Sequence, residues 1–205
     1  AHPDFRDELF HDAQEAGLID RNRTLTESLF GVYPSRMEEI RRFDGQQVTF
    51  RPIKAVDGRL IQEYFYSMDE KDVQARFFGI RRSFFREDME GMFQIDYIKN
   101  FSIVAVTGEV GFEKIIGLGE YALEQGTVAE VAFSVSKQWK HLGIATALLE
   151  KLTEAARENS LTGLIAYTHL DNTGMIRLFN KLPYKVETIL EGGTLVLKCN
   201  FEEAL

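Results

Sequence analysis

Cysteine, proline and long apolar runs are scarce in this 205-residue chain, and each scarcity excludes a class of protein. The one cysteine, Cys199, excludes an internal disulfide and a zinc site built from several cysteines, and we expect no metal. Four prolines against 16 glycines argue against a proline-rich linker protein. No apolar run approaches the roughly 20 residues that span a bilayer, so we expect no membrane partner.

Basic residues are also in deficit. The formal net charge is −8 and the sequence pI is about 5.1, whereas a general nucleic-acid binder needs a basic surface, so we expect no nucleic-acid partner. The first residues are polar and lack the apolar core of a signal peptide, which predicts a cytoplasmic protein. Hydrophobic residues make up 44% and charged residues 27%, which is ordinary globular composition.

Residues 1–47 and 48–205 differ in pattern. The first segment is polar and contains one helix-like stretch, which predicts a helical arm that either packs on the main domain or is loosely ordered. Its apolar positions at helical spacing are Phe5, Leu9, Ala13 and Ala16, with Asp4 as N-cap and Gly17 as the stop. From Val48 onward strand and helix patterns alternate, which predicts an α/β (α+β) fold with helices on both faces of a mixed sheet of about seven strands.

The expected strands are 48–53, 101–107, 115–123, 127–135, 164–169, 186–191 and 194–200. The expected helices are 57–67, 69–78, 144–159 and 172–181, and the pattern of residues 81–94 is ambiguous.

One segment indicates chemistry: a strand at 130–135, a short glycine-containing loop, and then a strong amphipathic helix from Ile144. A helix that starts directly after such a turn presents unpaired backbone N–H groups and the positive end of its dipole, which together bind phosphate. Gly143 has no Cβ, so its backbone can approach a diphosphate, and Lys140 and His141 add positive charge nearby. Neither common nucleotide-binding motif occurs, because the chain lacks both G-x-x-x-x-G-K-[ST] and a strand-associated G-x-G-x-x-G.

The pattern Lys140-x-x-Gly143-x-Ala145 resembles the acetyl-CoA signature of the GNAT superfamily of acyl-CoA N-acyltransferases. It departs from the family's usual Gln or Arg at its first position, where lysine keeps the charge but loses planar, bidentate hydrogen bonding. The resemblance covers residues 48–200, including the opening strand and the late stretch from Asp171 to Tyr184.

Two narrower resemblances concern the rest of the chain. The stretch that begins Arg76-Phe77-Phe78 is similar to Pat-type bacterial protein lysine acetyltransferases, which often form one domain of a larger CoA-metabolising protein. Residues 1–9 resemble the end of acetyl-CoA hydrolase or CoA-transferase proteins, which implies a fused or partner CoA-metabolising enzyme; an expression scar at residues 1–6 is the alternative.

The resemblance implies that acetyl-CoA is the cosubstrate. We expect the motif strand to pair with the pantetheine amides through Phe133 and Val135, and the loop and helix start to hold the diphosphate. The residues predicted to bind acetyl-CoA are Phe133, Val135, Lys140, His141, Leu142, Gly143, Ile144, Ala145, Thr146 and Asn172. For Asn172, an N-cap role in the following helix explains the residue equally well.

Acyl transfer to an amine requires a proton acceptor. A lysine amine with a pKa near 10.4 is almost wholly protonated at pH 7, a deficit of about 3.4 pH units or roughly 4.6 kcal/mol. The resemblance implies that Glu130, at the start of the motif strand, is the general base, and apolar neighbours on the strand would raise its pKa. A surface glutamate paired with a basic side chain is the alternative, and Glu120 and Glu124 are competitors for the role.

Four further residues bear on the mechanism. The Ser134 N–H is placed to polarise the thioester carbonyl, unless Ser134 is an ordinary small inward residue. Many family members carry a tyrosine general acid where this chain has Phe179, so here the thiolate leaves unassisted or takes its proton from water. Cys199 is expected to be a buried residue rather than an acetylated nucleophile, which favours direct transfer in a ternary complex. His169 is expected to be a packed polar residue rather than a base.

The sequence thus predicts an acetyl-CoA-dependent N-acetyltransferase that acts on a protein lysine. A small amine is the alternative acceptor, and a non-catalytic acetyl-CoA-sensing regulatory domain of a fused CoA enzyme is the alternative function.

Overall fold

The computed structural model describes residues 5–18, 32–77, 96–109 and 111–204. Over these residues the α-helices are α1 Arg6–Glu15, α2 Gly58–Tyr66, α3 Glu70–Phe77, α4 Ile144–Glu158 and α5 Thr173–Phe179. The strands are β1 Glu39–Phe43, β2 Gln46–Pro52, β3 Asn100–Thr107, β4 Lys114–Ala122, β5 Val128–Val135, β6 Gly163–His169, β7 Tyr184–Glu191 and β8 Thr194–Ala204. Short 3-10 turns are η3 Ser35–Met37, η4 Ala55–Asp57 and η6 Lys137–Trp139.

The described strands form one eight-stranded sheet in the order β1-β2-β3-β4-β5-β6-β8-β7. Neighbouring strands are antiparallel except β5 and β6, which are parallel. The predicted mixed sheet is therefore confirmed, with eight strands instead of about seven. The ambiguous segment 81–94, Phe78 and the predicted N-cap Asp4 lie outside the described residues.

The additional strand is β1, which lies before Val48, where the sequence pattern placed the start of the sheet. It pairs with β2 over five residues, so the sheet begins inside the segment assigned to the helical arm. Its sequence, EIRRF, has no apolar alternation because it is an edge strand whose inward positions include charged residues. Arg41 donates to Glu150 of α4, and Lys151 of α4 binds Glu39 at 2.8 Å, so ion pairs take the place of apolar packing.

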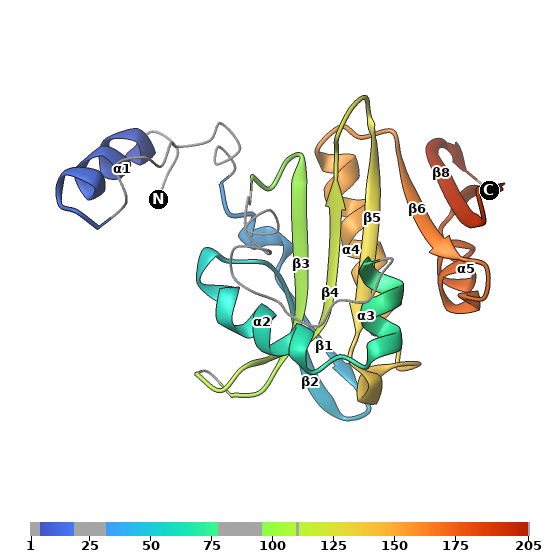
Figure 1. Cartoon of the computed structure of the whole chain (residues 1–205), viewed down its shortest axis with the longest axis horizontal. Helices are drawn as coiled ribbons and strands as arrows, with labels where there is room; N and C mark the ends of the chain where they lie inside the picture. The colour runs from blue at the N-terminus through green and yellow to red at the C-terminus, as the bar shows by residue number, and fades with distance from the viewer. Residues whose placement is uncertain (1–4, 19–31, 78–95, 110, 205) are drawn as a thin grey trace.

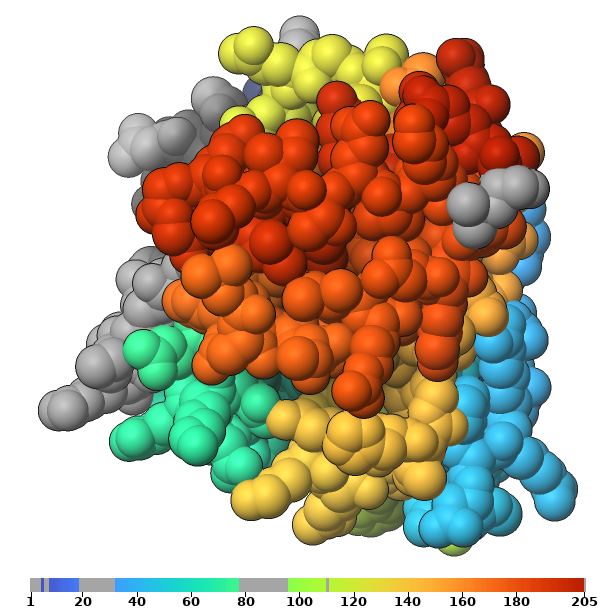
Figure 2. Space-filling model, turned by 90° about the vertical axis from the view of Figure 1, so that its right-hand side faces the viewer, coloured from blue at the N-terminus to red at the C-terminus, as the bar shows by residue number. Residues whose placement is uncertain are grey.

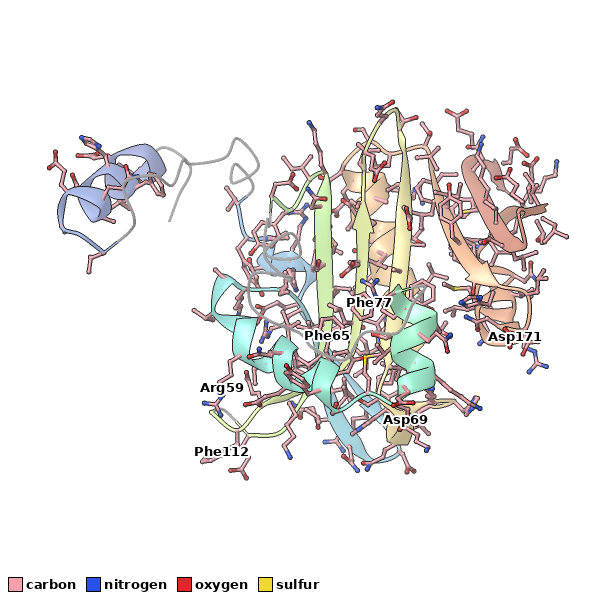
Figure 3. All side chains as sticks on the ribbon, in the orientation of Figure 1. Arg59, Phe65, Asp69, Phe77, Phe112 and Asp171 are labelled. Carbon is pink, nitrogen blue, oxygen red and sulfur yellow. The ribbon has the colours of Figure 1, made fainter. Side chains whose placement is uncertain are left out.

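Helices cover both faces of the sheet, as predicted, and β3 shows why its sequence is continuously apolar. Ile103 and Ala105 belong to the core cluster shared with α4, whereas Val104 and Val106 belong to the cluster shared with α2. Figure 1 shows α2 and α3 in front of the sheet and α4 behind it. Phe65 of α2 and Phe77 of α3 meet with ring centroids 5.4 Å apart, which joins the two front helices over the sheet (Figure 3).

Helix α4 packs closely against β4 in the core. A Cβ added at Gly117 would stand 3.1 Å from a methyl of Ile144, and one at Gly119 would stand 3.2 Å from a methyl of Leu152. These two glycines allow α4 to lie directly on the sheet, which fixes where its first turn sits relative to β5.

The helix predicted in the arm is confirmed as α1, which ends just before Gly17. Two of its predicted apolar residues, Phe5 and Leu9, are 57% and 51% exposed. Within the described part of the chain, none of the helices combines the length and apolar character needed to cross a bilayer.

Candidate functional site

The parallel strands β5 and β6 pair over three residues and then separate, which leaves part of β5 with a free edge. Val128, Ala129 and Glu130 pair with Gly163, Leu164 and Ile165 of β6. On its other edge, β5 pairs with β4 as far as Val135, and within the described residues β6 continues only with β8. Figure 1 shows β5 and β6 diverging beyond this point.

The backbone of residues 131–135 therefore offers hydrogen-bonding groups along one edge, which can pair with an extended amide chain. Phe133 and Val135, predicted to bind pantetheine, lie on this edge and are half-buried.

The free edge leads through η6 to the start of α4. Gly143 is the N-cap residue, with a left-handed φ of +98°, and no side chain caps the helix. The first helical hydrogen bond runs from the Ala147 N–H to the Gly143 carbonyl, so the N–H groups before Ala147 remain for another acceptor. Together with the helix dipole, these N–H groups can bind an anion next to the β5 edge.

Glycine at 143 is required mainly by backbone conformation. A Cβ built there would meet only a Phe43 ring carbon, at an ordinary 3.5 Å, whereas the φ angle of +98° strains any residue that has a side chain. The neighbouring His141 also has a positive φ of +66°, and both His141 and Leu142 are exposed. Of the predicted residues, His141, Leu142 and Gly143 thus form an exposed turn, whereas Ile144 is buried in the core and Ala145 and Thr146 are half-buried in the first turn of α4.

The sequence predicts that the positive charge of Lys140 adds to the site at the start of α4, and the structure differs. The Lys140 Nζ donates to both carboxylate oxygens of Asp72 in α3, at 2.6 and 2.8 Å, so its positive charge is compensated. A second ion pair of 3.1 Å joins Lys137 to Asp69 at the foot of α3 (Figure 3). Figure 2 shows the green surface of α3, the gold surface before α4 and the orange surface around α5 on one face of the molecule.

A positive side chain that the sequence pattern did not single out stands at the other side of the turn. The Lys181 Nζ donates to the Thr146 Oγ in the first turn of α4, at 3.4 Å. Its spacing in the sequence gives no signal, because only the packing of α5 beside α4 brings the two residues together.

Ser134 is linked to α2 through the side chain of Tyr64. The Tyr64 hydroxyl donates to the Ser134 Oγ at 2.9 Å, and Tyr64 is buried. Burial raises the pKa of Tyr64, so the phenol stays protonated and can serve as a donor. The side chain of Ser134 therefore faces α2, and its backbone lies on the β5 edge.

Glu130 lies at the end of the paired part of β5 and projects from the sheet face that carries α3. Partial burial is the main cause that raises its pKa, and Glu124 raises it further, while Arg76 opposes the shift. Of its two competitors, Glu120 is held by an ion pair with Arg76 of α3. Among the described residues, no basic group lies within ion-pair distance of Glu130, which disfavours the alternative of a paired surface glutamate.

Glu130 also lines an open cleft of about 440 Å³ on the same face. The cleft is lined by Ala122, Glu124, Gln125, Val128, Glu130, Ile165, Tyr167 and Lys198. The proposed base is thus accessible to a second substrate from the side of the sheet that faces α3.

Most of the residues that the sequence singled out around α5 have structural roles. Asn172 caps α5: its Oδ1 accepts from the Met175 N–H at 3.1 Å, and its Nδ2 donates to the Thr168 Oγ at 2.8 Å. The N-cap interpretation is confirmed, and a contact with CoA stays a prediction. Phe179 and Cys199 are buried in the core, as expected for Cys199, whereas His169 is exposed, contrary to the prediction of a packed residue.

Comparison with known proteins agrees with this geometry. The model of the acetyltransferase (GNAT) family matches residues 65–184. An acetyltransferase of Pseudomonas aeruginosa is 24% identical over 134 residues, which is 64% of this chain and 72% of the relative.

Solved structures show the same fold. The GNAT domain of S. lividans PAT superposes with a TM-score of 0.74 at 24% identity, covering 82% of this chain and 99% of that domain. The acetyltransferase yncA from Salmonella typhimurium, solved with its cofactor acetyl-CoA, gives a TM-score of 0.58 at 16% identity, covering 75% of this chain and 94% of that one. With the family model spanning more than half of its residues, the chain belongs to the acetyltransferase (GNAT) family and is an acetyl-CoA-dependent acyltransferase.

Proposed function

We propose that this enzyme acetylates the side-chain amine of a protein lysine by direct attack on acetyl-CoA in a ternary complex, with Glu130 as general base. The observation that carries the proposal is the continuity of three features: an exposed carboxylate, a free strand edge and an uncapped helix start along residues 130–146.

The chain offers a match for each part of an acyl-CoA. The free edge at Phe133 and Val135 pairs with the two amides of the pantetheine arm, as an added strand would. The N–H groups at the start of α4 hold the diphosphate, with Gly143 giving the backbone its left-handed turn and Lys181 supplying a nearby positive charge. The cosubstrate supplies the activated acyl group; the protein aligns it and polarises its carbonyl through the Ser134 N–H.

Proton transfer falls to Glu130. The nitrogen of the neutral acceptor amine bonds to the acyl carbon, the carboxylate takes the proton that this nitrogen loses, and the carbon–sulfur bond breaks to release the CoA thiolate. A raised pKa brings the carboxylate closer in basicity to the amine that it must deprotonate, because partial burial and Glu124 both disfavour its charged form. The thiolate takes its proton from water, since Phe179 has no hydroxyl and is buried.

The test is Glu130→Gln, which keeps the shape of the side chain and removes its basicity. We expect loss of acetyl transfer by about 10²–10⁴-fold in kcat, the range for a general base, with CoA affinity by calorimetry unchanged. If the variant retains full activity, Glu130 is not the base; if the wild type releases no CoA with protein and small-amine acceptors, the sensing-domain alternative replaces the enzyme proposal.

Gly143→Val tests the diphosphate site separately. The variant must hold a valine at φ +98°, so the turn relaxes and CoA binding weakens while β5 and Glu130 stay in place. Undiminished CoA affinity in this variant would place the diphosphate elsewhere.

A further inference from the structure

The cleft beside Glu130 is built on one row of residues that crosses four strands. Ala122 of β4 pairs with Glu130 of β5, Glu130 with Ile165 of β6, and Ile165 with Lys198 of β8. Register partners project from the same face, so Glu130 and Lys198 stand on either side of Ile165. Tyr167, two residues further along β6, shares that face.

The two sides of this cleft carry opposite charge. Glu124 and Glu130 lie on the side of β4 and β5, Lys198 lies on β8, and Tyr167 of β6 also lines the cleft. Strands are spaced about 4.8 Å apart, so the backbones of Glu130 and Lys198 are about 10 Å apart, with the Ile165 side chain as an apolar floor between them.

Within the described ranges, no ion pair engages Glu124, Glu130 or Lys198, whereas the adjacent Glu120 is tied to Arg76. On its other side, Lys198 has Glu187 of β7 as its register partner, outside the residues that line the cleft, and these two described residues form no ion pair. The cleft is open to solvent on this face of the sheet. An open cleft with opposite charges at its two sides and an apolar floor is complementary to a ligand that carries both charges on a short apolar spacer.

We propose that this cleft selects an acceptor that bears a carboxylate as well as the reacting amine, with Glu130 and Glu124 facing the amine and Lys198 and Tyr167 binding the carboxylate. The inference rests on the proposed function, because it takes Glu130 as the base. In a protein acceptor the carboxylate belongs to an acidic residue next to the target lysine; in a free amino acid it is the α-carboxylate.

Two matched substrate pairs separate these sources. One pair is a lysine peptide flanked by aspartates and the same peptide flanked by asparagines, and the other is free lysine and lysinamide. We expect the wild-type enzyme to prefer the carboxylate-bearing member of at least one pair by about twofold to fivefold in kcat/KM, as for an ion pair at a partly exposed site. Preference within the peptide pair identifies a protein acceptor, and preference confined to free lysine identifies an amino acid.

Charge reversal at Lys198 then tests whether this residue binds the carboxylate of the acceptor. Lys198→Glu is expected to abolish or invert the preference, mostly through KM, and raising the salt concentration is expected to weaken it in the wild type. The matched control is Lys114→Glu, an exposed charge reversal at the opposite end of β4, which should leave the preference unchanged. Circular dichroism and thermal melting confirm that both variants fold.

The outcomes are distinct. Transfer to all four substrates without a preference, or a preference that survives Lys198→Glu, overturns the assignment of the cleft and leaves the proposed function standing. Absence of CoA release with every acceptor overturns the proposed function, and this inference with it.

Discussion

Two glutamates on opposite sides of the sheet show how differently this protein treats its carboxylates. Glu39 of β1 accepts from Arg41 at 2.7 Å and binds the largely buried Lys151 of α4 at 2.8 Å, and these two partners lower its pKa to about 2. Glu130 of β5 has no basic partner within ion-pair distance among the described residues, and its pKa is raised. The first carboxylate holds an edge strand on a helix, and the second is left available for chemistry.

The difference teaches which charges belong to folding and which to function. Compensated carboxylates stabilise the folded state and cannot accept a proton near neutral pH, whereas an uncompensated, partly buried carboxylate weakens folding slightly and is a better base. Replacing Glu130 with glutamine should therefore reduce activity and spare stability, whereas replacing Glu39 with glutamine should reduce stability and spare activity.

The largest expected effect is that activity is lost in one of these two variants and stability in the other. Glu130→Gln should cost about 10²–10⁴ in kcat and change the free energy of unfolding by less than about 0.5 kcal/mol. Glu39→Gln should leave kcat within about twofold and destabilise the fold by about 1 kcal/mol, because Lys151, at 9% side-chain exposure, is left with its longer ion pair of 3.3 Å to Glu154. Urea unfolding and steady-state kinetics on both variants check the pair, and equal losses of activity would break the comparison.

The next effect is on acid stability. The folded-state pKa of Glu39, about 2, lies below its unfolded value of 4.5, so its contribution is present above pH 4.5 and is lost as the pH falls toward 2. Because the side chain is about one-third exposed, we discount the contribution to about 1 kcal/mol. Unfolding curves of wild type and Glu39→Gln should converge between pH 5 and pH 2; a constant gap would show that the loss in the variant is not electrostatic.

The sequence predicts those parts of the fold and the site that are formed by residues close together along the chain. The strand, loop and helix at 130–158 are local, so period and turn residues were enough to place the free edge, Gly143 and Glu130 together. The partners Tyr64, Asp72 and Lys181 come from elements 70, 68 and 35 residues away along the chain, and only the packed sheet brings them to the site. β1 was missed for a similar reason, because charged residues on an edge strand hide its period until the α4 partners are known.

A smaller effect concerns the pH dependence of catalysis. Glu124 is one cause of the raised pKa of Glu130, so Glu124→Gln should lower that pKa and move the acidic limb of the kcat/KM profile to lower pH, by less than about one pH unit. The control is Glu63→Gln, an exposed glutamate of α2 paired with Arg59, which should leave the limb in place. A shift in the alkaline direction would mean that Glu124 does not act on Glu130 through its charge.

The smallest expected effect comes from removing the carboxylate that neutralises Lys140. Asp72→Asn removes the carboxylate that holds Lys140, so the ammonium becomes free beside the start of α4, where anionic diphosphate is expected to bind. CoA should then bind about twofold to threefold more tightly at low salt, the scale of one partly exposed ion pair, and the gain should vanish at high salt. Asp69→Asn is the matched control, because it frees Lys137, which lies three residues farther from the helix start and is 76% exposed. Calorimetric titration with CoA at two ionic strengths decides the point: if Asp72→Asn weakens binding, the ion pair with α3 positions the turn, and Lys140 contributes by holding the backbone rather than by its charge.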